Sequence, residues 1–455
     1  MKPKVKIIAT LGPSTNNPES VSALIDKGVN VFRLNFSYGT HQEHEKTIRL
    51  IREISSKKGR LVGILQDICG PKIRIRGLKK PVEVFRGDVL KVSSDLQKGD
   101  FSISYPEILS DFQKGDLIFF ADGTVQSEVI DTDKETLTLK ILTKGILKEG
   151  KGVNFPKDGL SLNALTKKDQ EDIRFGVKMN IDFIAISFVS SEKDIIEAKS
   201  LLQDSDAWIV AKIERKSAVE EIDKIIKVSD AIMVARGDLG AEIGLSRVPT
   251  LQKEIIAKSN MEGKPVITAT QMLTSMINSP YPTRAEVSDI ANALLDGTDA
   301  VMLSDETAIG NYPLEALDVI VETIKETQKS YPYHKNFIPD IKEAFPHAAS
   351  NLSEKLPASF CVALTRSGYT LKHLSKFRPQ KPIYCITPTL SLLNKTTLIW
   401  GVEGGVYIKE FYTEKELVDK FFQISGIKPQ PFILVTGYLG EKISQGRSVR
   451  FISRF

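Results

Sequence analysis

Residues 208–238 read WIVAKIERKSAVEEIDKIIKVSDAIMVARGD and contain the repeating unit of this chain. The two ends, Trp208–Glu214 and Ala231–Asp238, are short apolar runs of the kind that form strands buried on both faces of a parallel sheet. Between them, Ser217–Val228 has the amphipathic pattern of a helix. The segment therefore predicts a strand–helix–strand unit in which each strand ends in charged residues.

The same unit recurs along most of the chain. Further apolar runs lie at Lys6–Thr10, Val31–Phe36, Leu61–Asp67, Phe183–Phe188, Pro265–Met272 and Ala300–Ser304. Helical stretches such as Arg247–Glu262 separate them. About eight strand–helix units close a barrel. The predicted fold class is α/β, built on a (β/α)8 TIM barrel.

Two other regions interrupt or follow this repeat. After Asp67 the pattern alternates with period two, as in Thr136–Lys140, which predicts an all-β domain placed to close over the site as a lid. After Tyr331 a second α/β pattern predicts a smaller, doubly wound domain. The expected boundaries are 1–68 and 158–335 for the barrel, 69–157 for the inserted β-barrel lid domain, and 336–455 for a C-terminal regulatory or oligomerisation domain.

Composition limits the classes of partner. The chain has 41% hydrophobic and 26% charged residues, a formal net charge of +5 and no Lys/Arg block, so neither nucleic acid nor a membrane is expected as a partner. Val5–Leu11 is too short to span a membrane. Cys69, Cys361 and Cys385 form no CxxC pair, which favours a cytoplasmic location. The histidines show no metal-ligand spacing, and we predict surface or capping roles for them.

Polar residues end nearly every predicted strand, and in a barrel these ends converge on the face that carries the active site. They are Arg33, Asn35, Ser37, Asp67, Ser187, Lys212, Glu214, Arg236, Asp238, Thr270 and Gln271. Isolated polar residues meeting water would explain one or two of these positions, but not the whole series.

Two carboxylates at neighbouring strand ends predict a divalent metal site. Glu214 and Asp238 suit Mg²⁺, which prefers a few carboxylate oxygens together with substrate oxygens and water. Lys212 lies two residues before Glu214 and so points to the same side, where a cation can stabilise phosphoryl transfer. The alternative is a pair of salt bridges with Lys212 and Arg236.

The second and sixth runs add possible anion and cation ligands. Arg33 suits a phosphate, while Asn35 and Ser37, with Asp67, offer oxygens to a cation. The segment Arg236–Gly240 could present backbone N–H groups to a carboxylate at a helix start, although it could equally be only a tight turn.

Several blocks of the sequence resemble the signature blocks of pyruvate kinases, in the order in which that family carries them. They are Ile8–Ser14, Phe32–His41, Gly70–Arg74, Ala211–Arg215, Met233–Gly244, Ile267–Met276, Thr283–Met302 and Leu303–Pro313. The resemblance implies transfer of a phosphoryl group from phosphoenolpyruvate to ADP, giving pyruvate and ATP in the final step of glycolysis. It also implies Mg²⁺ or Mn²⁺ and a homotetramer.

Site roles follow from the resemblance position by position. It implies that Arg33 and Lys212 contact the phosphoryl group, that Gly237, Asp238 and Thr270 receive the carboxylate and enolate end, and that Thr270 belongs to the relay that protonates the enolate. It implies that Glu214 and Asp238 hold the divalent metal and that Asn35, Ser37, Asp67 and Ile68 line a monovalent-cation site. It implies that Asn35, Tyr38, Arg74 and Lys168 face the nucleotide.

Some positions depart from the family pattern. Tyr38 stands where many relatives carry His, Ile68 replaces a common Thr whose backbone carbonyl is the group used, and Ile309 occupies a position that is Lys in some members. Lys72 stands where potassium-dependent members carry Glu. Its ammonium can perform the orienting task of K⁺, so we predict that K⁺ is not required. The alternative is that Lys72 only pairs with a lid carboxylate.

The C-terminal part predicts an effector site. Thr365, Arg366, Ser367, Gly368 and Thr370 follow a predicted strand and open a helix, offering N–H groups, hydroxyls and an arginine to a phosphorylated effector. An ordinary turn is the alternative, because Gly440–Arg450 lacks the family's usual end.

Two other functions share some of these features. A Mg²⁺-dependent barrel lyase for oxaloacetate-like acids would share the two carboxylates but would need neither the lid nor Arg33–Ser37. A non-catalytic metabolite sensor would be indicated by loss of Lys212 or Glu214, and both are present.

Overall fold

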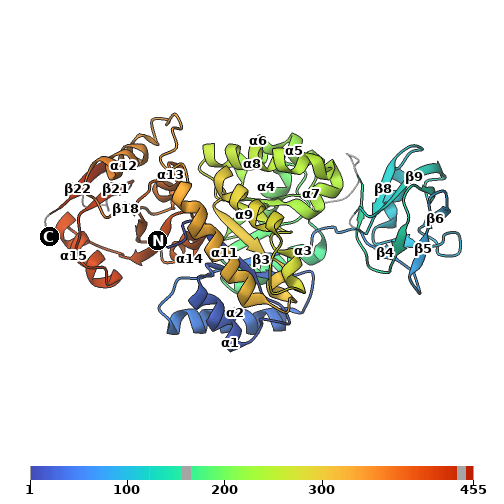
Figure 1. Cartoon of the computed structure of the whole chain (residues 1–455), viewed down its shortest axis with the longest axis horizontal. Coiled ribbons are helices and arrows are strands. Elements are labelled where there is room, and N and C mark those ends of the chain that lie inside the picture. Colours follow the sequence, from blue (N-terminus) through green and yellow to red (C-terminus); the bar gives the residue numbers. More distant parts are fainter. Residues whose placement is uncertain (1, 122, 156–164, 438–446, 454–455) are drawn as a thin grey trace.

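The computed structural model describes residues 2–121, 123–155, 165–437 and 447–453. An inserted β unit, a central barrel and a C-terminal α/β unit lie in a row, and the barrel lies between the other two (Figure 1). The chain begins beside the C-terminal unit, so both ends of the barrel sequence lie near it (Figure 1).

The central unit is a closed parallel barrel, as predicted. Its strands follow the order β1-β17-β16-β15-β14-β13-β3-β2. Their bounds are β1 Lys6–Thr10, β2 Val31–Asn35, β3 Gly63–Asp67, β13 Phe183–Ile186, β14 Trp208–Ile213, β15 Ala231–Ala235, β16 Val266–Ala269 and β17 Ala300–Leu303. Seven of these strands are buried along their whole length, which explains their continuous apolar runs. Several predicted runs extend past the strand end, so their last polar residues lie on connecting segments.

Helices cover the outside of the barrel. They are α1 Pro18–Lys27, α2 His41–Lys57, α3 Lys167–Lys178, α4 Glu192–Ser200, α5 Lys216–Glu220, α6 Ile222–Val228, α7 Arg236–Ile243, α8 Val248–Met261, α9 Arg284–Asp296, α10 Asp305–Ala308 and α11 Pro313–Thr327. The predicted helix Ser217–Val228 is divided, because the backbone at Glu221 leaves the helical range between α5 and α6. One continuous apolar core joins the helices to the strands.

The inserted unit is all β, as predicted. Its strands are β4 Ile75–Arg76, β5 Val82–Val84, β6 Val89–Ser93, β7 Ser102–Ile103, β8 Leu117–Phe120, β9 Val125–Thr132, β10 Thr136–Ile141, β11 Gly145–Leu147 and β12 Val153–Asn154. The main sheet has the order β12-β8-β9-β10-β6. It encloses an apolar core of its own, which includes Phe101, Phe120 and Leu139. The boundary expected at residues 157 and 158 lies outside the described residues.

The C-terminal unit is doubly wound. Its elements are α12 Ala344–Lys355, β18 Phe360–Leu364, α13 Tyr369–Lys376, β19 Ile383–Thr387, α14 Leu392–Lys395, β20 Val402–Tyr407, α15 Glu414–Ser425, β21 Phe432–Thr436 and β22 Ser448–Ile452. The sheet order is β20-β19-β18-β21-β22, and only β22 is antiparallel to its neighbour. Alternate residues of β18 pack on opposite sides: Cys361 and Ala363 join the cluster of α13, and Phe360 and Val362 join that of α15.

A buried arginine joins the C-terminal unit to the barrel. Arg378 is 1% exposed, and its guanidinium lies 2.8 Å from the Asp299 carboxylate at the start of β17. It also donates to Asn260 Oδ1 and to the Gly297 carbonyl, each at 2.8 Å. The other Asp299 oxygen accepts from Val266 N at 2.9 Å, at the start of β16. The contact therefore fixes the C-terminal unit against two barrel strands.

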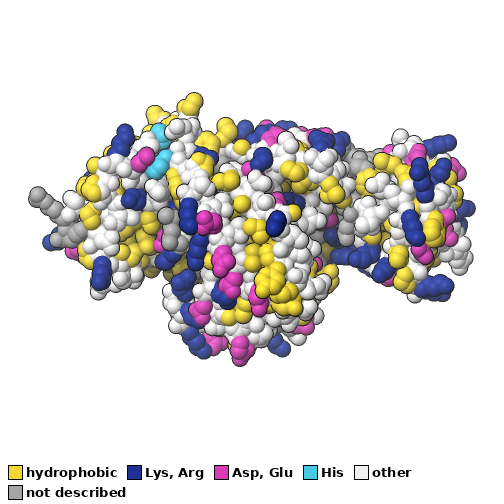
Figure 2. Space-filling model, viewed as in Figure 1, with side chains coloured by type: hydrophobic (Ala, Val, Ile, Leu, Met, Phe, Trp, Pro, Cys, Tyr) yellow, Lys and Arg dark blue, Asp and Glu magenta, His cyan; other side chains and the backbone are white. Residues whose placement is uncertain are grey.

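The surface is mixed in charge. On the face drawn in Figure 2, basic side chains alternate with acidic ones over the barrel. Among the described residues, no helix is long and apolar enough to cross a membrane.

Candidate active site

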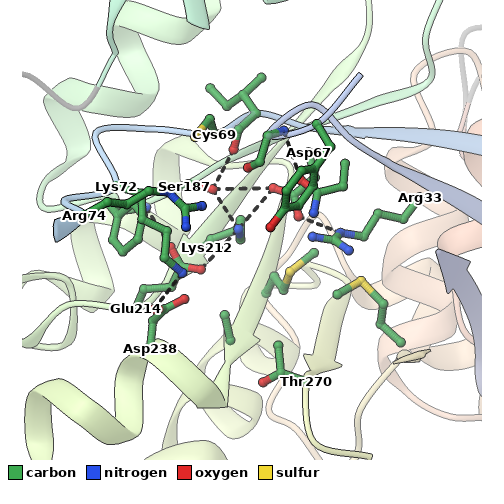
Figure 3. A pocket seen from close by; sticks show the side chains of 18 residues that line it. Arg33, Asp67, Cys69, Lys72, Arg74, Ser187, Lys212, Glu214, Asp238 and Thr270 are labelled. Carbon is green, nitrogen blue, oxygen red and sulfur yellow. Dashed lines mark hydrogen bonds and ion pairs between the residues drawn. The ribbon is translucent and has the colours of Figure 1, made fainter. Parts of the chain in front are cut away.

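A cavity of about 140 Å³ opens at the carboxyl ends of the barrel strands. Its lining includes most of the residues that the sequence singled out, together with several from the start of the inserted unit (Figure 3). The lining residues are Arg33, Asn35, Ser37, Tyr38, Asp67, Ile68, Cys69, Lys72, Arg74, Ser187, Phe188, Lys212, Glu214, Met233, Ala235, Asp238, Thr270 and Met302.

Lys212 lies at the centre of this cavity, held by three neighbours (Figure 3). Its amine donates to Ser187 Oγ at 2.7 Å and lies 3.0 Å from Asp67 Oδ1 and 3.1 Å from Glu214 Oε1. Burial alone would lower the pKa of Lys212, but the two carboxylates outweigh it and raise the pKa above its ordinary value. The amine is therefore a fixed positive charge at neutral pH.

Arg33 supplies a second cation from β2. Its Nε lies 2.7 Å from Asp67 Oδ2, and its Nη1 donates to Thr10 Oγ1 at 3.1 Å. Burial alone would raise the pKa of Asp67, but Lys212 and Arg33 outweigh it and lower the pKa. Asp67 thus holds both cations in place on one side of the cavity.

Glu214 and Asp238, the predicted ligands of a divalent metal, both line the cavity. Glu214 is 2% exposed, and its Oε2 accepts from Phe188 N at 2.8 Å. Burial raises the pKa of Glu214, and the nearby Asp238 carboxylate raises it further. Lys212 opposes this rise but does not outweigh it. Among the described residues no group of three or more His, Cys, Asp or Glu could hold a metal. Two carboxylates facing a cavity still fit Mg²⁺, which takes its remaining oxygens from substrate and water.

The alternative of two salt bridges holds for only one of the carboxylates. Lys212 does pair with Glu214, but Arg236 turns away from Asp238 and pairs with Asp289. The Arg236 guanidinium also donates to the Thr270 carbonyl at 2.6 Å and to the Gln271 carbonyl at 3.2 Å. Asp238 is thereby left facing the cavity.

Thr270 sits in a strained turn at the end of β16. Thr270 and Gln271 have φ values of +67° and +53°, in the left-handed region that residues with a Cβ rarely occupy. Arg236 stabilises this turn through both carbonyls. The Thr270 hydroxyl accepts from Gly237 N at 2.9 Å, which brings it to the start of α7 beside Asp238. The expected helix start at Arg236–Gly240 is thus present, with its Gly237 N–H directed at Thr270.

Lys72 reaches Asp238 across the cavity. Its amine lies 3.3 Å from Asp238 Oδ1 and 6.0 Å from the centre of the Phe188 ring. The alternative in which Lys72 pairs only with a lid carboxylate is wrong, because its partner belongs to α7 of the barrel.

The residues of the expected monovalent-cation site lie together, but their oxygens already accept hydrogen bonds. Asn35 Oδ1 accepts from Ser37 N at 3.1 Å, and the Ile68 carbonyl accepts from Ser187 Oγ at 2.7 Å. Both Asp67 oxygens contact cationic side chains. A monovalent cation bound here would share these oxygens with the groups that already contact them.

Of the four residues expected to face the nucleotide, three line the cavity and one does not. Asn35, Tyr38 and Arg74 line the cavity, and Tyr38 is 68% exposed at its mouth. Arg74 Nη1 donates to the Gly150 carbonyl of the inserted unit at 2.9 Å. Lys168 is not among the residues that line the cavity, and its amine donates instead to the Phe36 carbonyl at 2.8 Å.

The expected effector segment lies at a separate cavity of about 210 Å³ in the C-terminal unit. Thr365, Arg366, Ser367 and Thr370 line it together with Lys342, Phe345, Pro346, Tyr369, Thr436, Gly437 and Arg447. Gly368 caps α13 in the left-handed region, with φ +84°. Within Gly440–Arg450, residues 440–446 lie outside the described part of the chain.

Sequence reasoning missed some contacts and misjudged one histidine. The sequence identifies Ser187 only as a strand-end residue, yet its hydroxyl donates to the Ile68 carbonyl and accepts from Lys212. Its position at the end of a buried strand was the available signal. The surface or capping role is wrong for His373, which is 7% exposed inside α13 because it packs against Gly263.

A cavity lined by fixed cations and paired carboxylates, at the carboxyl ends of a parallel barrel, defines a (β/α)8 enzyme built to bind an anionic substrate. Family models agree with this class. Residues 2–317 match the pyruvate kinase barrel domain, and residues 343–432 match the pyruvate kinase alpha/beta domain.

Individual relatives point the same way. Pyruvate kinase 2 of Synechocystis sp. is 43% identical over 413 residues, covering 88% of this chain and 70% of the relative. Pyruvate kinase of Sporosarcina psychrophila is 42% identical over 419 residues, covering 88% and 71%. The crystal structure of a pyruvate kinase from Cryptosporidium parvum superposes with a TM-score of 0.91 at 33% identity, covering 99% of this chain and 96% of that chain. The chain belongs to the pyruvate kinase family.

Proposed function

We propose that this chain transfers the phosphoryl group of phosphoenolpyruvate to ADP, giving pyruvate and ATP. The observation that carries the proposal is the Lys212 amine, held between Asp67 and Glu214 in a cavity that also contains Arg33. Phosphoryl transfer asks little covalent chemistry of a protein and depends on positioning and on stabilising charge in transit. A preorganised lysine and arginine beside a pair of carboxylates meet that need.

Each group has a role in this proposal. Lys212 and Arg33 bind the phosphoryl oxygens and stabilise the charge that develops on them. Glu214 and Asp238 hold Mg²⁺ or Mn²⁺, which when bound neutralises charge on substrate oxygens. Gly237 and Asp238 receive the carboxylate end of the substrate. Thr270 contacts the enolate end and takes part in delivering the proton that completes pyruvate.

The nucleotide enters from the side of the inserted unit. Asn35, Tyr38 and Arg74 contact it from the cavity, and Lys168 reaches it from the start of α3. We place the domain boundaries where the sequence suggested them, with residues 69–157 closing as a lid over the substrates.

Further proposals concern ions, partners and location. We propose turnover without K⁺, because the Lys72 ammonium, 3.3 Å from Asp238 Oδ1, can help to orient the substrate and the nucleotide, the task that K⁺ would otherwise perform. The cavity beside Arg366 and Arg447 supports a phosphorylated effector. A homotetramer and a cytoplasmic location are proposed from the family alone.

A coupled assay tests the main proposal. The purified chain is mixed with phosphoenolpyruvate, ADP and Mg²⁺, and pyruvate is followed through lactate dehydrogenase and NADH oxidation. We expect turnover that requires ADP and the metal and that EDTA abolishes. Pyruvate formed from oxaloacetate but not from phosphoenolpyruvate would indicate the lyase instead, and no turnover with either would indicate a sensor.

A further inference from the structure

The first turns of α3 lie beside the cavity without lining it. Two buried carboxylates there hold the segments that do line it, Asp169 directly and Asp172 through Lys168. Asp169 is fully buried, and its Oδ2 accepts from Thr166 N and Oγ1 at 2.9 and 2.6 Å, which caps the helix. Its other oxygen, Oδ1, accepts from Gly70 N at 3.0 Å. One carboxylate therefore starts the helix and holds the chain where it leaves the barrel for the inserted unit.

The Gly70 contact has consequences for the cavity. Gly70 has a φ of +65°, and a Cβ there would lie 2.9 Å from the Ser187 side chain. The backbone is thus confined between Ser187 and Asp169. Because Lys72 and Arg74 follow within a few residues, this contact fixes where both side chains enter the cavity.

Asp172 acts on the other bordering segment. It is 1% exposed, and its two oxygens lie 2.6 Å from Lys168 Nζ and 2.7 Å from His41 Nε2. The same Lys168 amine donates to the Phe36 carbonyl at 2.8 Å. Phe36 directly precedes Ser37 and Tyr38, which line the cavity, so the contact reaches the edge of the site.

We propose that Asp172 is a positioning residue for the nucleotide side of the site, acting through Lys168. The Lys168 side chain is 54% exposed and has a long flexible stem, so without a partner its amine would sample many positions. The buried carboxylate holds the amine against the Phe36 carbonyl, so that less conformational freedom is lost when an anionic nucleotide binds. The inference rests on the proposed function, in which Lys168 faces ADP.

A double-mutant cycle tests the coupling. Asp172→Asn keeps the shape of the side chain and removes its charge, Lys168→Met removes the amine, and the third variant combines both. We expect Asp172→Asn to raise KM for ADP about tenfold, as loss of a hydrogen bond between charged groups does, with KM for phosphoenolpyruvate changed by less than about twofold. The double variant should be no worse than Lys168→Met alone.

Controls separate this role from a structural one. Glu171→Gln removes a charge from an exposed neighbour on the same helix and should leave both KM values unchanged. Lys168→Gln changes an exposed side chain without threatening the core, and it should raise KM for ADP as Asp172→Asn does, which keeps the proposal testable if Asp172→Asn does not fold. Asp172→Asn should raise KM for ADP by the same factor in a His41→Gln background as in the unmodified chain.

The outcomes distinguish the inference from the proposed function. Three outcomes would overturn the positioning role of Asp172. The first is additive effects of the Asp172 and Lys168 changes, and the second is an equal rise in KM for ADP and for phosphoenolpyruvate. The third is the loss of the Asp172→Asn effect on KM for ADP in a His41→Gln background. If Lys168→Met leaves KM for ADP unchanged, the nucleotide role of Lys168 is wrong and the inference falls with it, while turnover of phosphoenolpyruvate in the coupled assay still stands.

Discussion

Replacement of Lys212 by Met removes the charge at the centre of the cavity. The amine has three contacts, at 2.7 Å to Ser187, 3.0 Å to Asp67 and 3.1 Å to Glu214. Losing a preorganised charge at a transferring group costs about 3 kcal/mol of transition-state stabilisation, which is about a hundredfold or more in rate. We therefore expect kcat in the coupled assay to fall by at least that factor.

The same change affects stability and metal binding. Lys212 pairs with carboxylates that are nearly inaccessible, and removing one partner of a buried ion pair costs about 3–5 kcal/mol. Arg33 remains 2.7 Å from Asp67, so we expect a loss near the lower end of that range. Glu214 loses its main attraction to a cation, so its pKa, already raised by burial, rises further. The burial of these groups therefore predicts a loss of stability and a metal affinity that depends more steeply on pH.

The measurements are kcat, the urea-unfolding midpoint and Mn²⁺ affinity at two pH values. Because a proton competes with the metal for Glu214, the affinity of Lys212→Met should fall more at the lower pH than that of the unmodified chain. Lys224→Met, an exposed change on α6, is the control and should alter none of these. Near-normal turnover in a well-folded Lys212→Met variant would refute the role assigned to Lys212.

Four further predictions follow from the ion pairs and the second cavity. Activity should be equal in K⁺, Na⁺ and tetramethylammonium buffers of matched ionic strength, and Lys72→Glu should create a K⁺ requirement; strong activation of the unmodified chain by K⁺ alone would contradict this. Sugar phosphates or nucleotides should shift the phosphoenolpyruvate saturation curve, and Arg366→Ala should abolish the shift; if no compound shifts it, the segment is only a turn. Lys212 and Arg33 outweigh burial and lower the pKa of Asp67 in the folded state, so the stabilisation by its carboxylate is present above pH 3.8 and is lost as the pH falls through the folded-state pKa. The free energies of unfolding of the unmodified chain and of Asp67→Asn should therefore converge in acid. A difference that stays constant with pH would oppose this. Arg378→Met should lower the free energy of unfolding by about 3–5 kcal/mol in urea titrations, since it leaves Asp299 buried without its partner, and a loss below about 1 kcal/mol would be inconsistent with that contact.

The sequence predicts those site residues that lie at the ends of buried strands, because in a barrel the strand ends meet on one face. Lys212 and Glu214 lie at the end of a buried run, and their two-residue spacing predicts that they point to one side, which the 3.1 Å contact between them confirms. Thr270 and Asp238 likewise follow buried runs and line the cavity. Their individual roles in phosphoryl transfer remain predictions that the variants above test.

The apolar runs of the sequence determined the barrel, because a strand buried on both faces has to be apolar throughout and the polar residues can occur only where it ends. Only the tertiary structure decided which polar residues meet. Arg236 contacts Asp289 and the Thr270 carbonyl. Lys72 pairs with Asp238, and Asp172 pairs with Lys168. Lys212 and Asp67 are 145 residues apart in the chain, and the direction of a side chain beyond a strand end depends on loop backbone and on neighbours brought from such distances. The hydrophobic periodicity of the sequence cannot predict those contacts, because they form only when the barrel closes.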